Sequence, residues 1–135
     1  MRTHVEFRSN ASPAEPGEEE TINPGRWGKL LAGYLHRQLK QRGFQLKEAI
    51  GFEDWGCRVE LEQTPFPIWI GCGNYEEYPD GFLCFIEPSK PTIRKSLFKK
   101  IDTTTEVERL ADALDAILQS DPEIRGIRWW SDQEV

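Results

Sequence analysis

The stretch from Pro65 to Pro88, PFPIWIGCGNYEEYPDGFLCFIEP, constrains the fold more than any other part of the chain. Two apolar runs, 66–72 and 82–86, flank the tripeptide Pro79-Asp80-Gly81. This tripeptide favours a tight turn, because Pro presets φ, Asp bonds to its own backbone and Gly tolerates a positive φ. The stretch therefore predicts a β-hairpin with its tip at Pro79-Asp80-Gly81.

A tip at these residues would fix the register of the two strands. Tyr78 should oppose Phe82, and Asn74 should oppose Ile86. Strands that are apolar on both faces are typical of the middle of a sheet, so we expect the other elements to pack around this hairpin. Because side chains alternate along a strand, one face should carry Ile68, Ile70, Cys72, Phe82, Cys84 and Ile86. The other face should carry Trp69, Tyr75, Leu83 and Phe85, around a shallow depression left by Gly71 and Gly73.

Composition indicates one folded domain. The chain has 135 residues, of which 38% are hydrophobic and 11% aromatic. A disordered chain would lack these aromatic residues, and this length suits one core, so we expect a single domain over residues 1–135. The N-terminus has no apolar signal-type region, and no apolar run approaches the ~20 residues of a membrane span. We therefore expect a cytoplasmic protein without a membrane partner.

The three cysteines, Cys57, Cys72 and Cys84, lie in apolar strand patterns and show no C-x-x-C spacing. An odd number without such spacing predicts free, buried thiols rather than a disulfide framework or a zinc site. We expect no cofactor and no metal.

Charge is segregated along the chain, although the net charge is −6. Residues 26–42 and 90–100 are basic and contain no acid, whereas residues 53–87 are acidic. An acidic average argues against general nucleic-acid binding, because duplex binding depends on neutralising phosphates.

In the N-terminal part, alternation over residues 2–8 predicts a half-buried strand. Residues 9–21, rich in Glu, Pro and Gly, predict a mobile, solvated loop, with an acidic arm for a basic partner as the alternative. Asn23-Pro24 should then start a helix that Gly43 closes. Its predicted buried stripe comprises Trp27, Leu30, Leu31, Tyr34, Leu35 and Leu39.

Residues 44–50 and 57–63 read as two further strands, joined by a turn at Asp54 and Trp55. Residues 89–105 predict a short amphipathic helical turn, which could bind an acidic partner or an anionic ligand, or could be a packed connection. A long helix follows, capped by the box Thr105-x-x-Glu108. Its stripe comprises Val107, Leu110, Ala111, Leu114, Ile117 and Leu118, and the chain ends with a strand over 124–130 and a frayed tail over 131–135.

These elements predict the order β-α-β-β-β-β-α-β. We expect an α+β fold, with a mainly antiparallel sheet and two helices packed on one face. Whether residues 89–103 fold over the second face of the sheet is left open by the sequence.

No catalytic motif is present in the sequence. Cys72 would need a base such as His4, and the predicted register points Cys72 into the core, where a thiol is inert. Glu76, Glu77 and Asp80 could bind a hard cation, but a plain solvated loop is the favoured interpretation of this cluster.

The strings NPGRWGK, EDWG and IGCGNYEEYPDGFLCFIEP resemble short, uncharacterised bacterial proteins of the domain-of-unknown-function kind. That resemblance implies no catalytic residues. In size and charge the chain is also similar to the immunity proteins that accompany bacterial toxins.

Two functions remain open at this point. The first is a non-enzymatic, protein-binding role of the immunity or regulatory type, with a protein partner or a second copy of the chain. Its acidic and aromatic binding surface would comprise Trp55, Trp69, Gly71, Gly73, Tyr75, Glu76, Glu77 and Phe85. The alternative is a small-molecule-binding protein or an enzyme, with a pocket around Gly71, Gly73, Trp55 and Trp69.

Overall fold

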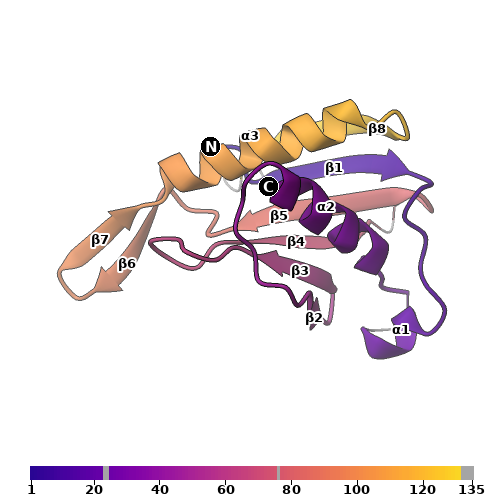
Figure 1. The fold of residues 1–135 in the computed structure, drawn as a ribbon, viewed down its shortest axis with the longest axis horizontal. Helices are drawn as coiled ribbons and strands as arrows, with labels where there is room; N and C mark the ends of the chain where they lie inside the picture. Colours follow the sequence, from indigo (N-terminus) through magenta and orange to yellow (C-terminus); the bar gives the residue numbers. More distant parts are fainter. Residues whose placement is uncertain (23–24, 76, 132–135) are drawn as a thin grey trace.

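The computed structural model describes residues 1–22, 25–75 and 77–131 of the chain. These residues form an antiparallel six-stranded sheet with helices and a separate two-stranded hairpin, which confirms the predicted α+β fold (Figure 1). The elements in chain order are β1 (His4–Ser9), α1 (Glu18–Thr21), α2 (Lys29–Gln41), β2 (Gly51–Glu53), β3 (Gly56–Glu60), β4 (Trp69–Asn74), β5 (Gly81–Glu87), β6 (Thr92–Ser96), β7 (Lys99–Asp102), α3 (Thr104–Ser120) and β8 (Ile124–Trp130).

The strand order in the large sheet is β2-β3-β4-β5-β1-β8, and each neighbouring pair is antiparallel. The hairpin of β4 and β5 therefore lies in the middle, as its apolar faces predict. The first strand, β1, and the last, β8, extend the meander on the β5 side.

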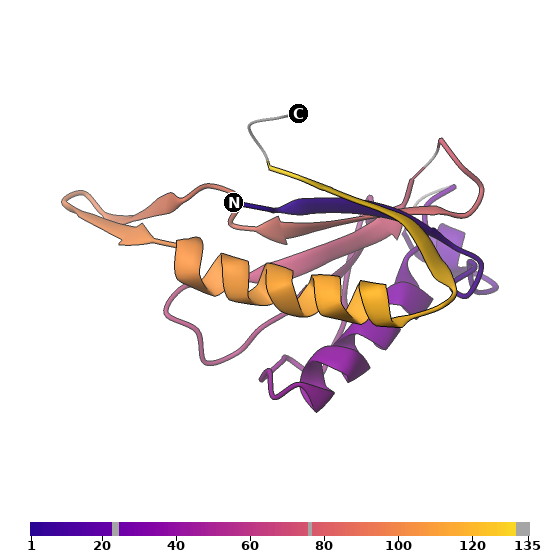
Figure 2. The ribbon, with the colours of Figure 1, turned by 90° about the horizontal axis from the view of Figure 1, so that it is seen from above.

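The two long helices, α2 and α3, pack on the same face of the sheet (Figure 2). All six residues of the predicted α3 stripe are buried. In α2 the stripe is shifted: Leu31, Leu35 and Leu39 are buried together with Ala32, whereas Leu30 is exposed. The predicted start of this helix at Asn23-Pro24 lies outside the described residues, and α2 begins at Lys29. No helix in the described ranges is long and apolar enough to cross a membrane.

The predicted register of the central hairpin is wrong by four residues. Asn74 pairs with Phe82 rather than with Ile86, and Ile70 pairs with Ile86. Gly81 already belongs to β5, and it does not adopt a left-handed φ. The N–H of Tyr75 donates to the carbonyl oxygen of Gly81 at 2.7 Å, so the connection is longer than the tight turn that the sequence suggests.

Because the shift is an even number of residues, every side chain stays on its predicted face. Cys72 pairs with Cys84 and Cys57 pairs with Cys72, so the three thiols lie side by side in the core. All three are free and buried, as the sequence predicts.

Two other sequence-based predictions are wrong. Residues 44–50 form a single bridge, between Leu46 and Leu61, instead of a strand, because only Phe44 and Leu46 are buried there. Within residues 89–105, where the sequence predicts a helical turn, residues 92–102 form the β6–β7 hairpin, with Ile93 opposite Ile101. This hairpin projects beyond the end of the sheet and does not fold over the second face (Figures 1 and 2).

The predicted capping box of α3 is also wrong. The helix begins at Thr104, and its N-cap residue Thr103 makes no side-chain cap hydrogen bond. Instead, the carboxylate of Asp102 accepts the backbone N–H of Thr104 at 2.8 Å. The Thr103 hydroxyl donates to the carbonyl oxygen of Lys90, which ties the helix start to the segment before β6.

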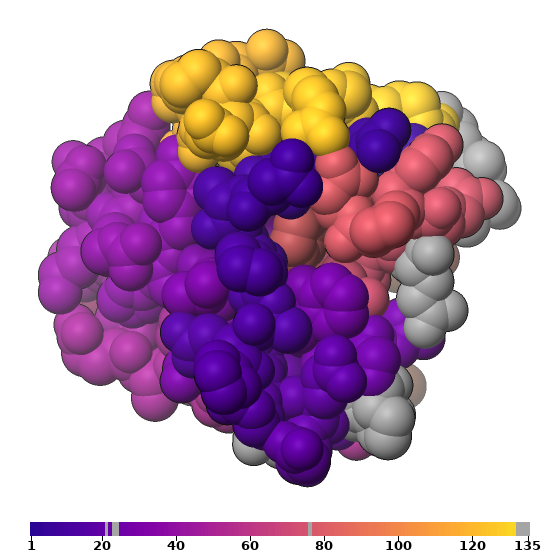
Figure 3. Space-filling view, turned by 90° about the vertical axis from the view of Figure 1, so that its right-hand side faces the viewer, coloured from indigo at the N-terminus to yellow at the C-terminus, as the bar shows by residue number. Residues whose placement is uncertain are grey.

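The acidic segment that follows β1 is docked where the sequence predicts a solvated loop. Glu18 is only 5% exposed, and its Oε2 accepts the backbone N–H groups of Gly28 and Lys29, each at 2.7 Å. The other oxygen, Oε1, accepts the N–H of Glu15 at 3.0 Å. Figure 3 shows the segment packed along the end of the molecule. A carboxylate from elsewhere in the chain thus satisfies the orphan N–H groups at the start of α2.

Replacing Glu18 with Gln tests this arrangement. The amide keeps one oxygen but loses its charge, and its NH₂ group faces an N–H donor, so we expect the free energy of unfolding to fall by about 1–3 kcal/mol. Urea denaturation measures this loss. The matched substitution is Glu20→Gln, at an exposed position of α1, the short helix that also contains Glu18. It should change the free energy of unfolding by less than about 0.5 kcal/mol. Equal effects of the two substitutions would show that Glu18 is not a cap.

Candidate functional site on the open face of the sheet

A row of aromatic rings crosses the sheet face that the helices leave open. His4 lies between Phe85 and Trp130, with ring centroids 5.9 and 5.6 Å apart. Phe85 also contacts Trp69 at 5.6 Å and Trp55 at 5.0 Å. We call Trp55, Trp69, Phe85, His4 and Trp130 the aromatic row.

Strand register creates this row. His4 pairs with Phe85 on one side and with Trp130 on the other, so three strands present a ring at the same level. Trp69 lies on the neighbouring strand β4, and Trp55 reaches over from the turn between β2 and β3. Of these five residues, His4 and Trp130 were not recognised from the sequence as part of a site. The outward position of His4 in an alternating strand was the available signal.

Both ends of the row are covered by guanidinium groups. Arg58 lies over the ring of Trp69 at 5.2 Å, and Arg128 lies over the ring of Trp130 at 4.6 Å. Each arginine also lies beside an acidic side chain. Arg128 forms an ion pair with Glu6 at 2.7 Å. Arg58 lies 3.7 Å from Glu53 and 3.6 Å from Glu60. Around the row, the charges of this face are therefore largely neutralised in pairs.

The glycines beneath the row let the rings approach the sheet. A Cβ atom on Gly71 would lie 2.4 Å from Cζ of Phe85 and 2.8 Å from the ring of Trp55. A Cβ atom on Gly73 would lie 2.6 Å from the carbonyl oxygen of Trp55. The depression predicted at these glycines is therefore occupied by Phe85 and by Trp55.

An open cleft of about 300 Å³ lies beside the row. Of the residues proposed from the sequence for a binding surface, Trp55, Gly73, Tyr75, Glu77 and Phe85 line this cleft, whereas Trp69 and Gly71 do not. Glu76 lies outside the described residues. Arg26 and Asn74, which were not among the site residues predicted from the sequence, also line the cleft. The lining residues are Arg26, Trp55, Gly73, Asn74, Tyr75, Glu77, Leu83 and Phe85.

Asn74 holds the segment that brings Arg26 to the cleft. Its Oδ1 accepts the N–H of Trp27 at 3.1 Å, and its Nδ2 donates to the carbonyl oxygen of Gly25 at 3.0 Å. The backbone N–H of Asn74 also donates to the carbonyl oxygen of Trp27. Three hydrogen bonds therefore fix residues 25–27 against the end of β4.

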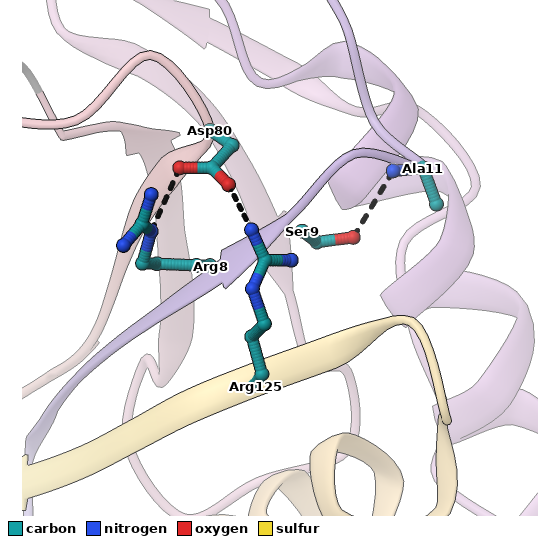
Figure 4. A network of polar contacts seen from close by, with 5 residues as sticks. All are labelled: Arg8, Ser9, Ala11, Asp80 and Arg125. Carbon is teal, nitrogen blue, oxygen red and sulfur yellow. Dashed lines mark hydrogen bonds and ion pairs between the residues drawn. The ribbon is translucent and has the colours of Figure 1, made fainter.

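Asp80 holds the other side of the cleft through a network shown in Figure 4. Its carboxylate accepts a hydrogen bond from Nε of Arg8 at 2.8 Å and pairs with Arg125, so it links the loop to β1 and β8. Arg8 also lies over the ring of Tyr78 at 4.5 Å. The hydrogen bond from Arg8, helped by the charges of both arginines, lowers the pKa of Asp80. Asp80 thus acts in a tertiary ion-pair network, in contrast to its predicted role as a turn residue.

The thiols and the acids of this region are poorly placed for catalysis or for metal binding. A hydrogen bond to Cys84 and burial raise the pKa of Cys72, and burial raises the pKa of Cys57 to about 12. His4 lies on the opposite face of the sheet from these thiols. No group of three or more His, Cys, Asp or Glu residues that could hold a metal ion occurs in the described part of the chain.

Comparison with protein-family models, with curated proteins and with solved structures finds no match. The function must therefore be argued from the geometry of this face.

The contact between Gly71 and the rings can be tested with Gly71→Ala. The added methyl group has to displace Phe85 and Trp55, so we expect a loss of about 1–3 kcal/mol in the free energy of unfolding. The near-ultraviolet circular dichroism of the tryptophans should change as well. Gly33→Ala, within α2 and next to only the flexible end of Arg37, should be neutral or slightly stabilising. An unchanged spectrum for Gly71→Ala would contradict the packing described here.

The Asp80 network predicts a pH-dependent contribution to stability. Because the folded-state pKa lies below the ordinary value of about 3.9, the ion pairs contribute fully above that value. Their contribution is lost as the pH falls through the lower, folded-state pKa. Asp80→Asn should therefore be less stable than the natural chain at pH 6, and the difference should shrink towards pH 2. Chemical denaturation at several pH values measures it, and a constant difference would contradict this role.

Proposed function

We propose that this chain is a non-enzymatic binding protein that holds a protein partner against the open face of its sheet. The aromatic row carries this proposal. Several large rings lie contiguously on a face that neither long helix covers, and monomeric proteins seldom leave such a surface without a partner.

The composition of the face suits a protein interface. Interface centres are enriched in Trp, Tyr, Phe and Arg, and they are surrounded by polar residues that exclude water. Here the rings are flanked by Arg58 and Arg128, and each of these arginines has an acidic neighbour. The cleft beside the row has room for one side chain of the partner.

The state of the polar groups supports binding rather than catalysis. Asn74 uses both ends of its side-chain amide to hold residues 25–27, and Asp80 is committed to Arg8 and Arg125. A protein that acts by occupying a partner's surface fits the immunity or regulatory type. Three buried, unpaired thiols suit the reducing cytoplasm of a bacterial cell, where we place it.

A small, flat ligand is the second candidate for the same cleft. Its volume of about 300 Å³ is at the lower end for ligand sites, and its wall is mainly apolar. Arg26 and Glu77 at its edge offer one group of each charge. Thermal-shift screening against metabolites separates the two candidates, because only a ligand site should give a reproducible rise in Tm with one class of compound.

The test of the protein partner starts with a photo-crosslinking amino acid at Tyr75, in the cleft, and at Gln41, at the end of α2. We expect a discrete protein adduct in the native cell from position 75 and none from position 41. Tyr75 is suited to this purpose because it is outside the aromatic row, whose rings stabilise one another.

The purified partner is then tested against Leu83→Ser, which removes an apolar wall of the cleft. Affinity should fall about tenfold or more, as it does when a central interface side chain is truncated. Leu30→Ser, a leucine removed from the α2 surface, is the matched control and should bind normally. Identical adducts from both positions, or undiminished binding by Leu83→Ser, would contradict the proposal.

A further inference from the structure

The β6–β7 hairpin carries the most exposed apolar residues of the described chain. Leu97 is 73% exposed and Phe98 is 94% exposed, whereas the next most exposed large apolar residue, Phe52, is 45% exposed. Both residues lie in the turn between the two strands. Ile93 and Ile101, at the other end of the hairpin, pack against the core and anchor it. We call residues 92–102 the cationic arm.

Cations surround the apolar tip without acidic neighbours. Arg94, Lys95, Lys99 and Lys100 lie within four residues of the turn. No carboxylate in the described ranges forms an ion pair with Lys95, Lys99 or Lys100. Arg94 donates to the carbonyl oxygen of Leu97 at 3.2 Å, within the arm itself. Asp102, the acid at the base of the arm, is engaged with the N–H of Thr104.

The arm holds this tip away from an acidic body. It extends beyond the end of the sheet along the long direction of the molecule (Figures 1 and 2). Five residues of strand span roughly 16 Å. This is about twice the Debye length of ~8 Å at physiological ionic strength, so the net negative charge of the body is largely screened at the tip.

We propose that the cationic arm binds the surface of an anionic lipid bilayer. Leu97 and Phe98 enter the headgroup region, and the basic side chains behind them lie at the level of the phosphates. This contact is superficial and reversible, and it needs no membrane-spanning helix, none of which occurs in the described ranges. It departs from the sequence-based expectation of no membrane partner. It is independent of the partner proposed for the open face.

The shape and the chemistry of the tip favour a bilayer over a protein. Two large apolar side chains at the end of a projecting turn need a counterpart that closes around them, as a fluid bilayer does. Three of the four cations are lysines, which are flexible, hydrated point charges suited to a diffuse anionic surface. Lysine is depleted in protein interfaces, where arginine and tyrosine or tryptophan predominate.

Nucleic acid is the other polyanion to consider. The outer part of the arm, residues 93–100, has only one aromatic ring, Phe98. Proteins that bind single strands use several rings as a stacking platform. A bilayer would therefore contact both the apolar side chains and the positive charges of the tip, whereas nucleic acid would contact mainly the positive charges.

Vesicle flotation with the full chain tests the proposal. The probes are vesicles of phosphatidylcholine alone and vesicles with one quarter phosphatidylglycerol, at 50 and 500 mM NaCl. We expect the protein to float with the anionic vesicles at low salt, and to be released by high salt because the lysines act through charge. Flotation should be absent with phosphatidylcholine alone.

Two variants separate the contribution of the apolar tip residues to vesicle binding from that of the lysines. Leu97→Ser with Phe98→Ser should weaken the partition coefficient about tenfold or more while leaving Tm unchanged, since both side chains already face water. Lys95→Glu with Lys99→Glu should abolish flotation. The control Lys40→Glu with Arg42→Glu makes the same change in net charge on α2, away from the arm, and should float like the natural chain.

Three results would overturn the proposal. The first is no flotation of the natural chain with anionic vesicles. The second is equal loss of flotation by the α2 control, which would indicate an effect of net charge alone. The third is undiminished flotation of the Leu97→Ser, Phe98→Ser variant. In the first case, binding of the natural chain to a 30-base-pair DNA duplex would assign the arm to nucleic acid.

Discussion

The pairing of β4 with β5 is the constraint on which the rest of the structure depends. Both strands are covered on two sides: α2 and α3 pack on one face, and the aromatic row lies on the other. Cys72 and Cys84 face the helices as a directly opposed pair, and Phe85 stands over Gly71 on the outer face. The outer rings are therefore stabilised by the same backbone pairing that organises the core, and the proposed binding surface and the core share one scaffold.

Carboxylates from distant segments hold the irregular parts of the chain to this scaffold. Glu18 binds the N-terminus of α2, and Asp80 links the loop before β5 to β1 and β8. The side-chain amide of Asn74 likewise holds the segment that carries Arg26 against the end of β4. A chain with a net charge of −6 thus uses several of its acids as internal ligands for N–H groups and guanidinium groups. As a result, the open face is close to charge balance although the chain is acidic.

The two surfaces proposed to bind lie on different parts of the molecule and differ in chemistry. The open face offers rigid, half-buried rings with paired charges, which suits a shaped protein surface. The cationic arm offers two highly exposed apolar residues, and its lysines Lys95, Lys99 and Lys100 form no ion pair within the described part of the chain, which suits a deformable anionic surface. Since the arm projects from the end of the sheet, both contacts can be made at the same time. A chain with both could hold its protein partner near a membrane.

The sequence by itself determined which residues face inward in most of the regular elements, although not in α2, where Leu30 is exposed. Alternation in β1, β3 and β8 and the stripe of α3 were readable because burial of one face imposes a period on the chain. Periodicity also placed Trp69 and Phe85 on one face. This assignment stayed correct despite a register error of four residues, because an even shift leaves each side chain on the same face of the sheet. Only the tertiary structure decided the register, the docking of Glu18 and the strand pairing of residues 92–102. The loop before β5 is held by Asp80, whose partners Arg8 and Arg125 are distant in sequence, and Glu18 binds N–H groups beyond its own helix. Local patterns carry no information about such partners. Residues 92–102 pair only with one another, but apolar residues four apart, such as Ile93, Leu97 and Ile101, fit one face of a helix and one face of a strand alike.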